Sequence, residues 1–205
     1  MVTPMSHRWL LAHLGEALDY PDERLRPRLD ALAPLARDHG PSAAAVDGFL
    51  AALAGYEIDA LSEIYTRTFD VAPICVPYLS IHLFGEESFR RASLMTGLSE
   101  SLAAAGVDLH GELPDHLAVV LRAAPALPDE VFDELLEFVL RAGVHAMVAV
   151  LDETPNPYRW LLRAVQAVVG PASADDLERL AAARRESQTH RQSAATGAGA
   201  ACGGR

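Results

Sequence analysis

Residues 156–171 read Asn-Pro-Tyr-Arg-Trp-Leu-Leu-Arg-Ala-Val-Gln-Ala-Val-Val-Gly-Pro and contain the start, the buried face and the end of one α-helix. Asn156 and Pro157 are typical of a helix start, because asparagine accepts a free backbone N–H and proline has no N–H to leave unpaired. The Gly170-Pro171 pair predicts the end of the helix. Between them, apolar residues recur at helical spacing, at Trp160, Leu161, Val165 and Val168.

The same helical spacing continues in both directions from this segment. We expect helices over residues 6–19, 22–37 (with breaks or kinks at Pro27 and Pro34), 56–69 and 86–105, and further helices that open at Pro41-Ser42, Pro77, Leu113, Leu127 and, after Gly143, near residue 144, and at Ser173. No strand-turn-strand pattern is present in the sequence. The fold class predicted is therefore all-α, a single-domain bundle of about nine to eleven short helices. The domain is expected to span residues 1–185, and residues 186–205, rich in Ser, Gln, Ala and Gly, are expected to form a disordered tail.

Composition and charge narrow the class of protein. Half of the 205 residues are hydrophobic and only 6% are aromatic, a balance that favours packed helices. The net charge is −11, from 28 acidic residues and 17 basic residues that are all arginine. Such a chain repels phosphate backbones, so no nucleic-acid partner is expected, whereas a basic peptide is attracted. An acidic surface also serves solubility alone.

The two cysteines and the apolar segments indicate the compartment. Cys75 and Cys202 form neither a disulfide framework nor a zinc-binding pair. The N-terminal residues lack the pattern of a secretory signal, and the longest mostly apolar stretch, Val144–Leu151, is too short to span a bilayer. We expect a cytoplasmic protein that touches a membrane only through a partner.

One candidate binding region runs from Tyr65 to Gly85, where aromatic residues and prolines gather around a break in the helical pattern. The segment 70–78 is expected to be a buried loop that leads into a short helix from Pro77. Tyr65 and Phe69, four residues apart, share a helical face. Such a surface suits the binding of a peptide or of an apolar helix face, while core packing under a loop explains the same aromatics equally well.

A second candidate is Glu112-Leu-Pro-Asp-His-Leu117. Proline near a helix start and acidic residues beside it predict a helix cap, as does the parallel Leu127-Pro-Asp129. The second copy lacks the histidine and the preceding glutamate. The cluster of Glu112, Asp115 and His116 is therefore either a polar network able to bind a cationic group or an ordinary helix cap.

The sequence contains few of the patterns that indicate catalysis. It has no His-Glu-x-x-His zinc motif, no phosphate-binding loop and no lysine, and Ser80 lacks the context of a hydrolase nucleophile. Apolar neighbours disfavour the thiolate of Cys75. A metal site would need His82, Asp115 and His116 to converge through the tertiary fold, and this gives one alternative, a helical metal-dependent hydrolase.

These motifs resemble those of the NarJ/TorD family of redox-enzyme maturation chaperones. The Tyr65–Asp70 stretch is similar to the family's Tyr-x-x-(Thr/Leu)-Phe-Asp segment, and Tyr78-Leu-Ser80 and Gly85 follow it in the same order. The Glu112–Leu117 segment is similar to Glu-Leu-Pro-Asp-His-Leu of the nitrate-reductase branch. The prolines before Tyr78 are closer to the TorD branch. Further resemblance at Leu18–Asp22 and at Asn156-Pro-Tyr158 extends the similarity to about residues 14–169.

The resemblance implies a TorD-like helical fold, no catalytic residues, no cofactor and no metal. It implies a monomer or dimer that binds the N-terminal segment of the catalytic subunit of a molybdopterin oxidoreductase during cofactor loading. Nitrate reductase is the first expected client, and another enzyme of the dimethyl-sulfoxide-reductase family is the second. By position, the expected client-binding residues are Tyr65, Phe69, Pro77, Tyr78, Ser80, His82, Glu112, Asp115 and His116.

Overall fold

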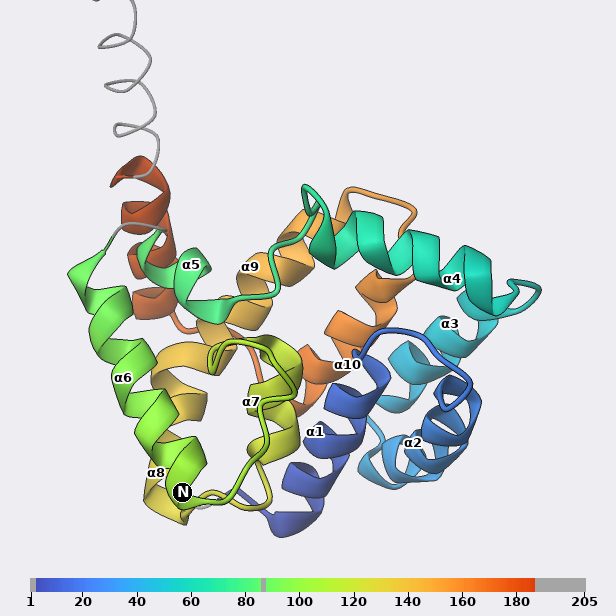
Figure 1. Cartoon of the computed structure of the whole chain (residues 1–205), viewed down its shortest axis with the longest axis horizontal. Helices are drawn as coiled ribbons and strands as arrows, with labels where there is room; N and C mark the ends of the chain where they lie inside the picture. Colours follow the sequence, from blue (N-terminus) through green and yellow to red (C-terminus); the bar gives the residue numbers. More distant parts are fainter. Residues whose placement is uncertain (1–2, 86–87, 187–205) are drawn as a thin grey trace, which may run out of the picture.

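The computed structural model describes residues 3–85 and 88–186, and these residues form a helical bundle (Figure 1). The predicted all-α fold class is confirmed, since no strand occurs within the described residues. The labelled elements are α1 (Met5–Ala17), α2 (Leu25–His39), α3 (Ala43–Leu53), α4 (Ile58–Tyr65), the π-helical turn η1 (Thr66–Asp70), α5 (Leu79–Phe84), α6 (Phe89–Ala104), α7 (Leu117–Ala123), α8 (Asp129–Leu135), the π-helical turn η2 (Leu136–Leu140), α9 (Arg141–Asp152) and α10 (Tyr158–Val169). A last helix covers residues 174–186.

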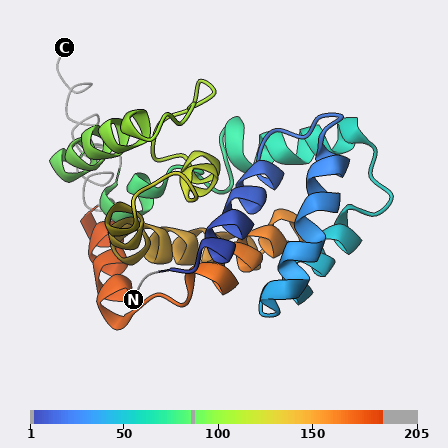
Figure 2. The same ribbon diagram turned by 90° about the horizontal axis from the view of Figure 1, so that it is seen from below.

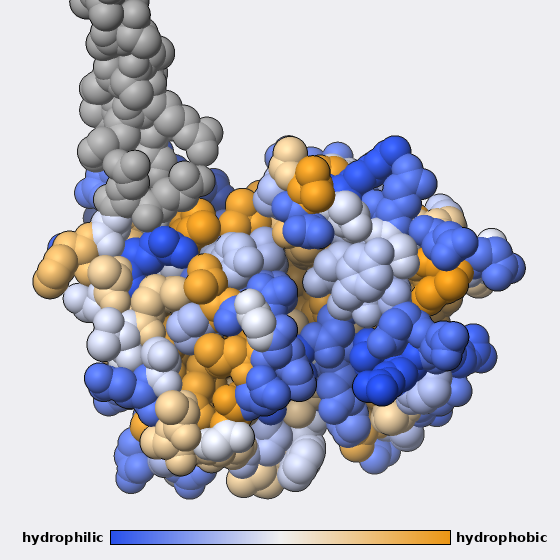
Figure 3. Space-filling view, in the orientation of Figure 1, coloured by the Kyte–Doolittle hydropathy of each residue, from blue (hydrophilic) through white to orange (hydrophobic). Residues whose placement is uncertain are grey.

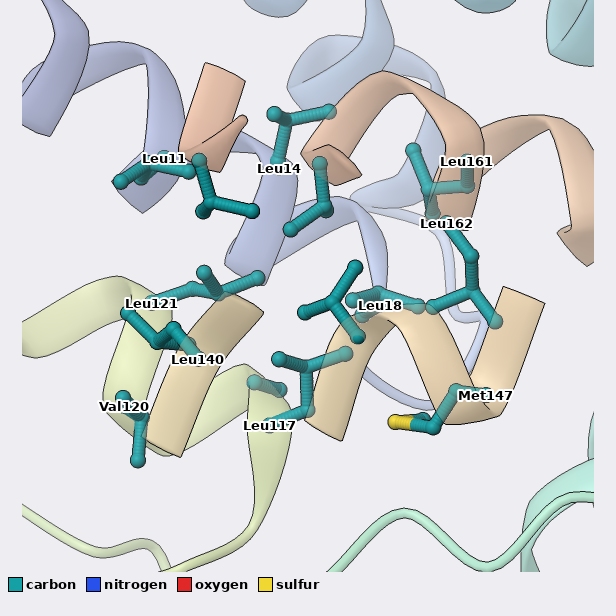
Figure 4. Packing of buried hydrophobic residues seen from close by; sticks show 14 of the residues in the cluster. Leu11, Leu14, Leu18, Leu117, Val120, Leu121, Leu140, Met147, Leu161 and Leu162 are labelled. Carbon is teal, nitrogen blue, oxygen red and sulfur yellow. The ribbon is translucent and has the colours of Figure 1, made fainter. Parts of the chain in front are cut away.

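Helices α1 and α10 form the centre of the bundle. Helix α1 packs against α7, α2 and α10, while α10 also contacts α3 and α9. Figure 2 shows α2 and α3 at one end of the molecule and α6 with the last helix at the other. Leucines and other apolar residues from these helices pack together in one buried cluster (Figure 4), and they include Leu11, Leu14, Leu117, Leu121, Met147 and Leu161.

Two glycines allow helices to approach one another closely. A Cβ atom at Gly15 would lie 2.9 Å from the carbonyl oxygen of Ala118, so the backbones of α1 and α7 almost touch. A Cβ atom at Gly143 would lie 2.5 Å from Cδ2 of Leu79, which is fully buried where α5 packs on α9. Gly143 therefore makes the space that seats the start of α5.

The predicted helix break at Gly143 is wrong, and of the break or kink expected at Pro34 the break does not occur. The sequence predicts a new helix after Gly143, but α8, η2 and α9 follow one another without interruption from Asp129 to Asp152. Gly143 lies inside this helix, and its lack of a side chain leaves room for Leu79 of α5. Helix α2 likewise continues through Pro34, which is exposed on its surface.

The C-terminal helix begins as the sequence predicts. Ser173 and Asp176 form a reciprocal cap, in which the Asp176 carboxylate accepts the Ser173 N–H (2.8 Å) and the Ser173 hydroxyl accepts the Asp176 N–H (3.1 Å). Glu186 is still helical, and the remainder of the predicted tail, residues 187–205, lies outside the described residues. None of the helices in residues 3–85 and 88–186 has the length and apolar composition needed to cross a membrane.

Candidate functional site

The two motifs singled out in the sequence lie side by side, joined through their backbones. The N–H of Leu79 donates to the carbonyl oxygen of Asp115 (3.0 Å), and the N–H of Leu117 donates to that of Pro77 (2.9 Å). These two hydrogen bonds form an antiparallel bridge between Tyr78 and His116. The start of α5 and the start of α7 therefore make one unit, although more than thirty residues separate them in the chain.

Asp115 is completely buried and holds the start of α5. Its Oδ2 accepts hydrogen bonds from the backbone N–H of Ser80 (3.2 Å) and from the Ser80 hydroxyl. Its Oδ1 has no hydrogen-bond partner among the described residues. An acceptor at the first amides of a helix satisfies donors that would otherwise be unpaired. Asp115 thus caps α5, a helix from another part of the chain.

The expectation that Leu113-Pro-Asp115 opens its own helix is wrong. The parallel segment does so, with Pro128 preceding α8 and Asp129 as its first residue. Helix α7, in contrast, begins only at Leu117. The carboxylate of Asp115 is bonded to Ser80 of α5, and the chain enters its own helix only two residues later, at Leu117.

His116 takes the capping role for α7. Its Nδ1 accepts the N–H of Ala118 (3.2 Å), and its ring packs edge-on against Tyr78 with 5.5 Å between ring centroids. Burial lowers the pKa of His116 below its usual value, so the ring is neutral at physiological pH. A neutral ring that accepts at Nδ1 carries its proton on Nε2.

Tyr78 and Glu112 are the members of the cluster that reach the surface. The Tyr78 hydroxyl donates to Oε2 of Glu112 (3.3 Å); Glu112 is exposed and Tyr78 is half-buried. Burial, followed by the negative charge of Glu112, raises the pKa of Tyr78. The phenol therefore stays protonated, and the pair presents an aromatic face beside a carboxylate.

The two segments that carry this pair also carry exposed apolar side chains. Val71 and Ile74, on the loop between η1 and α5, are 68% and 50% exposed, and Leu113 is 43% exposed. The loop expected to be buried is therefore only partly so, with Cys75 and Pro77 inside it. Figure 3 shows apolar surface on the face that carries α5, α6 and α7. Exposed apolar residues close to polar groups are typical of interaction surfaces.

Tyr65 and Phe69 belong to the core. They are 8% and 6% exposed and pack with Tyr158, whose ring centroid lies 5.8 Å from that of Tyr65 and 5.1 Å from that of Phe69. Of the two explanations left open for these aromatics, core packing agrees with the structure. In this conformation neither ring is available to a ligand.

The structure does not bring together His82, Asp115 and His116, the residues on which the alternative of a metal-dependent hydrolase relied. The Nε2–H of His82 donates to the carbonyl oxygen of Val76 (2.8 Å), while Asp115 and His116 cap two different helices. Within residues 3–85 and 88–186, no three His, Cys, Asp or Glu side chains are placed to hold a metal ion. Cys75 is buried, and burial raises the pKa of its thiol to about 12, which disfavours a nucleophilic role.

Sequence reasoning missed Arg91 of α6, which joins the cluster from a third element. Its Nε donates to the Ser80 hydroxyl (2.9 Å), the same hydroxyl that donates to Asp115. No motif includes Arg91, and it lies eleven residues after Ser80, so the sequence offers no signal for this contact.

A family model described as the nitrate reductase delta subunit matches residues 35–162, more than half of the chain, and the match includes both motifs. The chain belongs to this family, a family of maturation chaperones, and the resemblance to NarJ/TorD chaperones is confirmed. A search of curated proteins found no match.

Proposed function

We propose that the protein is a cytoplasmic chaperone that binds the N-terminal segment of a molybdoenzyme catalytic subunit. The client is nitrate reductase in the first instance, held until its molybdenum cofactor is inserted. The observation that carries this proposal is the bridge between Tyr78 and His116, which joins both family motifs beside an exposed apolar loop. The chaperone itself has no catalytic role in this proposal.

The chemistry of the surface selects an amphipathic, basic segment. Burying Val71, Ile74 and Leu113 against a client contributes roughly 25 cal/mol for each Å² of apolar surface removed from water. Glu112 accepts a cationic side chain at the edge of this surface, and Tyr78 offers its ring face to the same cation. The net charge of −11 attracts a basic segment from a distance.

Calorimetric titration with a peptide of the N-terminal segment of the nitrate reductase catalytic subunit tests the proposal. We expect saturable one-to-one binding. Glu112→Gln weakens the binding by about two- to fivefold, as expected for an exposed ion pair worth about 0.5–1 kcal/mol. The matched control is Glu178→Gln, an exposed glutamate on the last helix, which leaves the affinity unchanged.

Three outcomes separate the possibilities. Binding to the corresponding peptide of another molybdoenzyme, and not to that of nitrate reductase, would keep the chaperone role and change the client. Equal weakening by Glu112→Gln and Glu178→Gln would show that the whole charge of the protein, and not this site, attracts the peptide. The absence of heat with every molybdoenzyme peptide, at low and high salt, would refute the proposal.

A further inference from the structure

Helix α6 is held to the protein by few buried side chains. Leu98 and Leu102 are its buried residues, and both lie in its second half. The first half, residues 89–97, contains no buried side chain, and Phe89 at its start is 87% exposed. Among the labelled elements α6 packs chiefly against α5. Apolar burial therefore contributes little to holding the first half of α6 in place.

A chain of hydrogen bonds attaches the first half of α6 to α5 and to Asp115. Nε of Arg91 donates to the Ser80 hydroxyl (2.9 Å), and this hydroxyl donates to Oδ2 of Asp115. Ser80 and Asp115 are both fully buried. The hydroxyl thus lies between a guanidinium and a carboxylate, and hydrogen bonds that involve an ionised group are roughly twice as strong as those between neutral groups.

One oxygen of the Asp115 carboxylate takes no part in this chain of hydrogen bonds. Oδ1 of Asp115 is buried and accepts no hydrogen bond among the described residues. Such an atom costs free energy and calls for an explanation. A guanidinium carries five N–H donors, and the donor that Arg91 directs at this cluster, its Nε–H, is bonded to the Ser80 hydroxyl.

We infer that Asp115, Ser80 and Arg91 form a latch that positions α6 on α5. The latch also couples the attachment of α6 to client binding at Tyr78, and this coupling rests on the proposed function. Asp115 is adjacent to His116, whose backbone and ring contact Tyr78. A client that binds Tyr78 and Glu112 therefore acts on the segment that carries Asp115. In this inference Asp115 and Ser80 are positioning residues, and neither contacts the client.

The first experiment measures hydrogen–deuterium exchange of the full chain without a client. In Arg91→Met the amides of residues 89–97 exchange about tenfold faster than in the wild type, the factor that corresponds to loss of one charge-assisted hydrogen bond. The matched control is Arg90→Met, which removes the adjacent, exposed arginine and leaves this exchange unchanged. Asp115→Asn, which retains the shape of the side chain, shifts the exchange in the same direction as Arg91→Met.

Unchanged exchange of residues 89–97 in Arg91→Met would overturn the latch. Equal acceleration by Arg91→Met and Arg90→Met would overturn it as well, because it would assign the effect to the charge of the helix. The melting temperature separates local from global change: a latch predicts faster exchange in α6 with the melting temperature of Arg91→Met close to that of the wild type.

The second experiment repeats the exchange measurement with the nitrate reductase peptide bound. We expect binding to slow exchange of residues 89–97 in the wild type, and Arg91→Met to lose this slowing while still binding the peptide. A merely structural role for Arg91 would not produce a response that depends on the peptide. Binding without slowing in the wild type would overturn the coupling, whereas failure of the peptide to bind would count against the proposed function and leave the first experiment to decide the latch.

Discussion

Replacing Gly15 with alanine tests how closely α1 approaches α7. The new Cβ would lie 2.9 Å from the carbonyl oxygen of Ala118, 2.9 Å from Cβ of Leu121 and 3.0 Å from the backbone nitrogen of Arg122. None of these three atoms can rotate away, because two belong to the backbone and the third is attached to it. The two helices must therefore move apart by a few tenths of an ångström, at the centre of the core.

The magnitude follows from two opposing effects. Overpacking of a well-filled core costs about 1–3 kcal/mol, and the fixed backbone contacts at Gly15 place this site in the upper part of that range. Alanine in place of glycine inside a helix returns about 1 kcal/mol through its higher helix propensity. We expect Gly15→Ala to lower the free energy of unfolding by about 1–2 kcal/mol, which lowers the melting temperature of a chain of this size by roughly 2–8 °C.

The same substitution at Gly97 is the matched control. This glycine also lies inside a helix, α6, and a Cβ atom added to it would meet no other atom within 4 Å. Only the propensity effect remains there, so Gly97→Ala raises the free energy of unfolding by about 0.5–1 kcal/mol. Urea unfolding followed by circular dichroism measures both variants. A Gly15→Ala midpoint equal to or above that of the wild type would refute the close approach of the two helices.

Two further predictions concern buried polar side chains. Arg8→Met removes a fully buried guanidinium that donates to the carbonyl oxygen of Leu127 (2.8 Å). We expect this variant to lower the free energy of unfolding, measured in urea, by about 1.5–3 kcal/mol. A variant as stable as the wild type would contradict a stabilising role for this hydrogen bond. Burial lowers the pKa of His116, so on acidification the unfolded chain takes up the proton first, and stability is lost as the pH falls below about 6.5. His116→Asn keeps an acceptor for the N–H of Ala118, and urea midpoints between about pH 7.5 and 5.5 should fall less steeply in this variant; an unchanged slope would exclude His116 as a source of the pH dependence.

The helices could be predicted from the sequence wherever local chemistry decides them. Helix α10 runs from Tyr158 to Val169, within the limits that Asn156 and Gly170 set in the sequence. Gly143 misled the prediction because glycine has two uses, to end a helix and to admit a neighbour. The contact with Leu79 decides between them, and that contact belongs to the tertiary fold.

The sequence could predict that the two motifs belong together, but it could not predict what each residue contacts. The segments around Tyr78 and Glu112 were expected to act together, and the structure joins them. Asp115 was expected at the start of its own helix, but its partner is Ser80 on another element, so helix spacing carries no information about it. Arg91 could not be found at all, because its contribution depends entirely on where α6 lies.

The fit between Gly143 and Leu79 has a consequence for how sequences of this family can vary. Any side chain at position 143 would occupy space that the leucine at position 79 now fills, and position 79 directly follows Tyr78. Among relatives, a larger residue at position 143 is therefore expected only together with a smaller one at position 79. A larger side chain at position 143 alone would push on Leu79 and displace the start of α5 next to Tyr78, and paired substitutions at positions 79 and 143 among relatives would reveal the constraint.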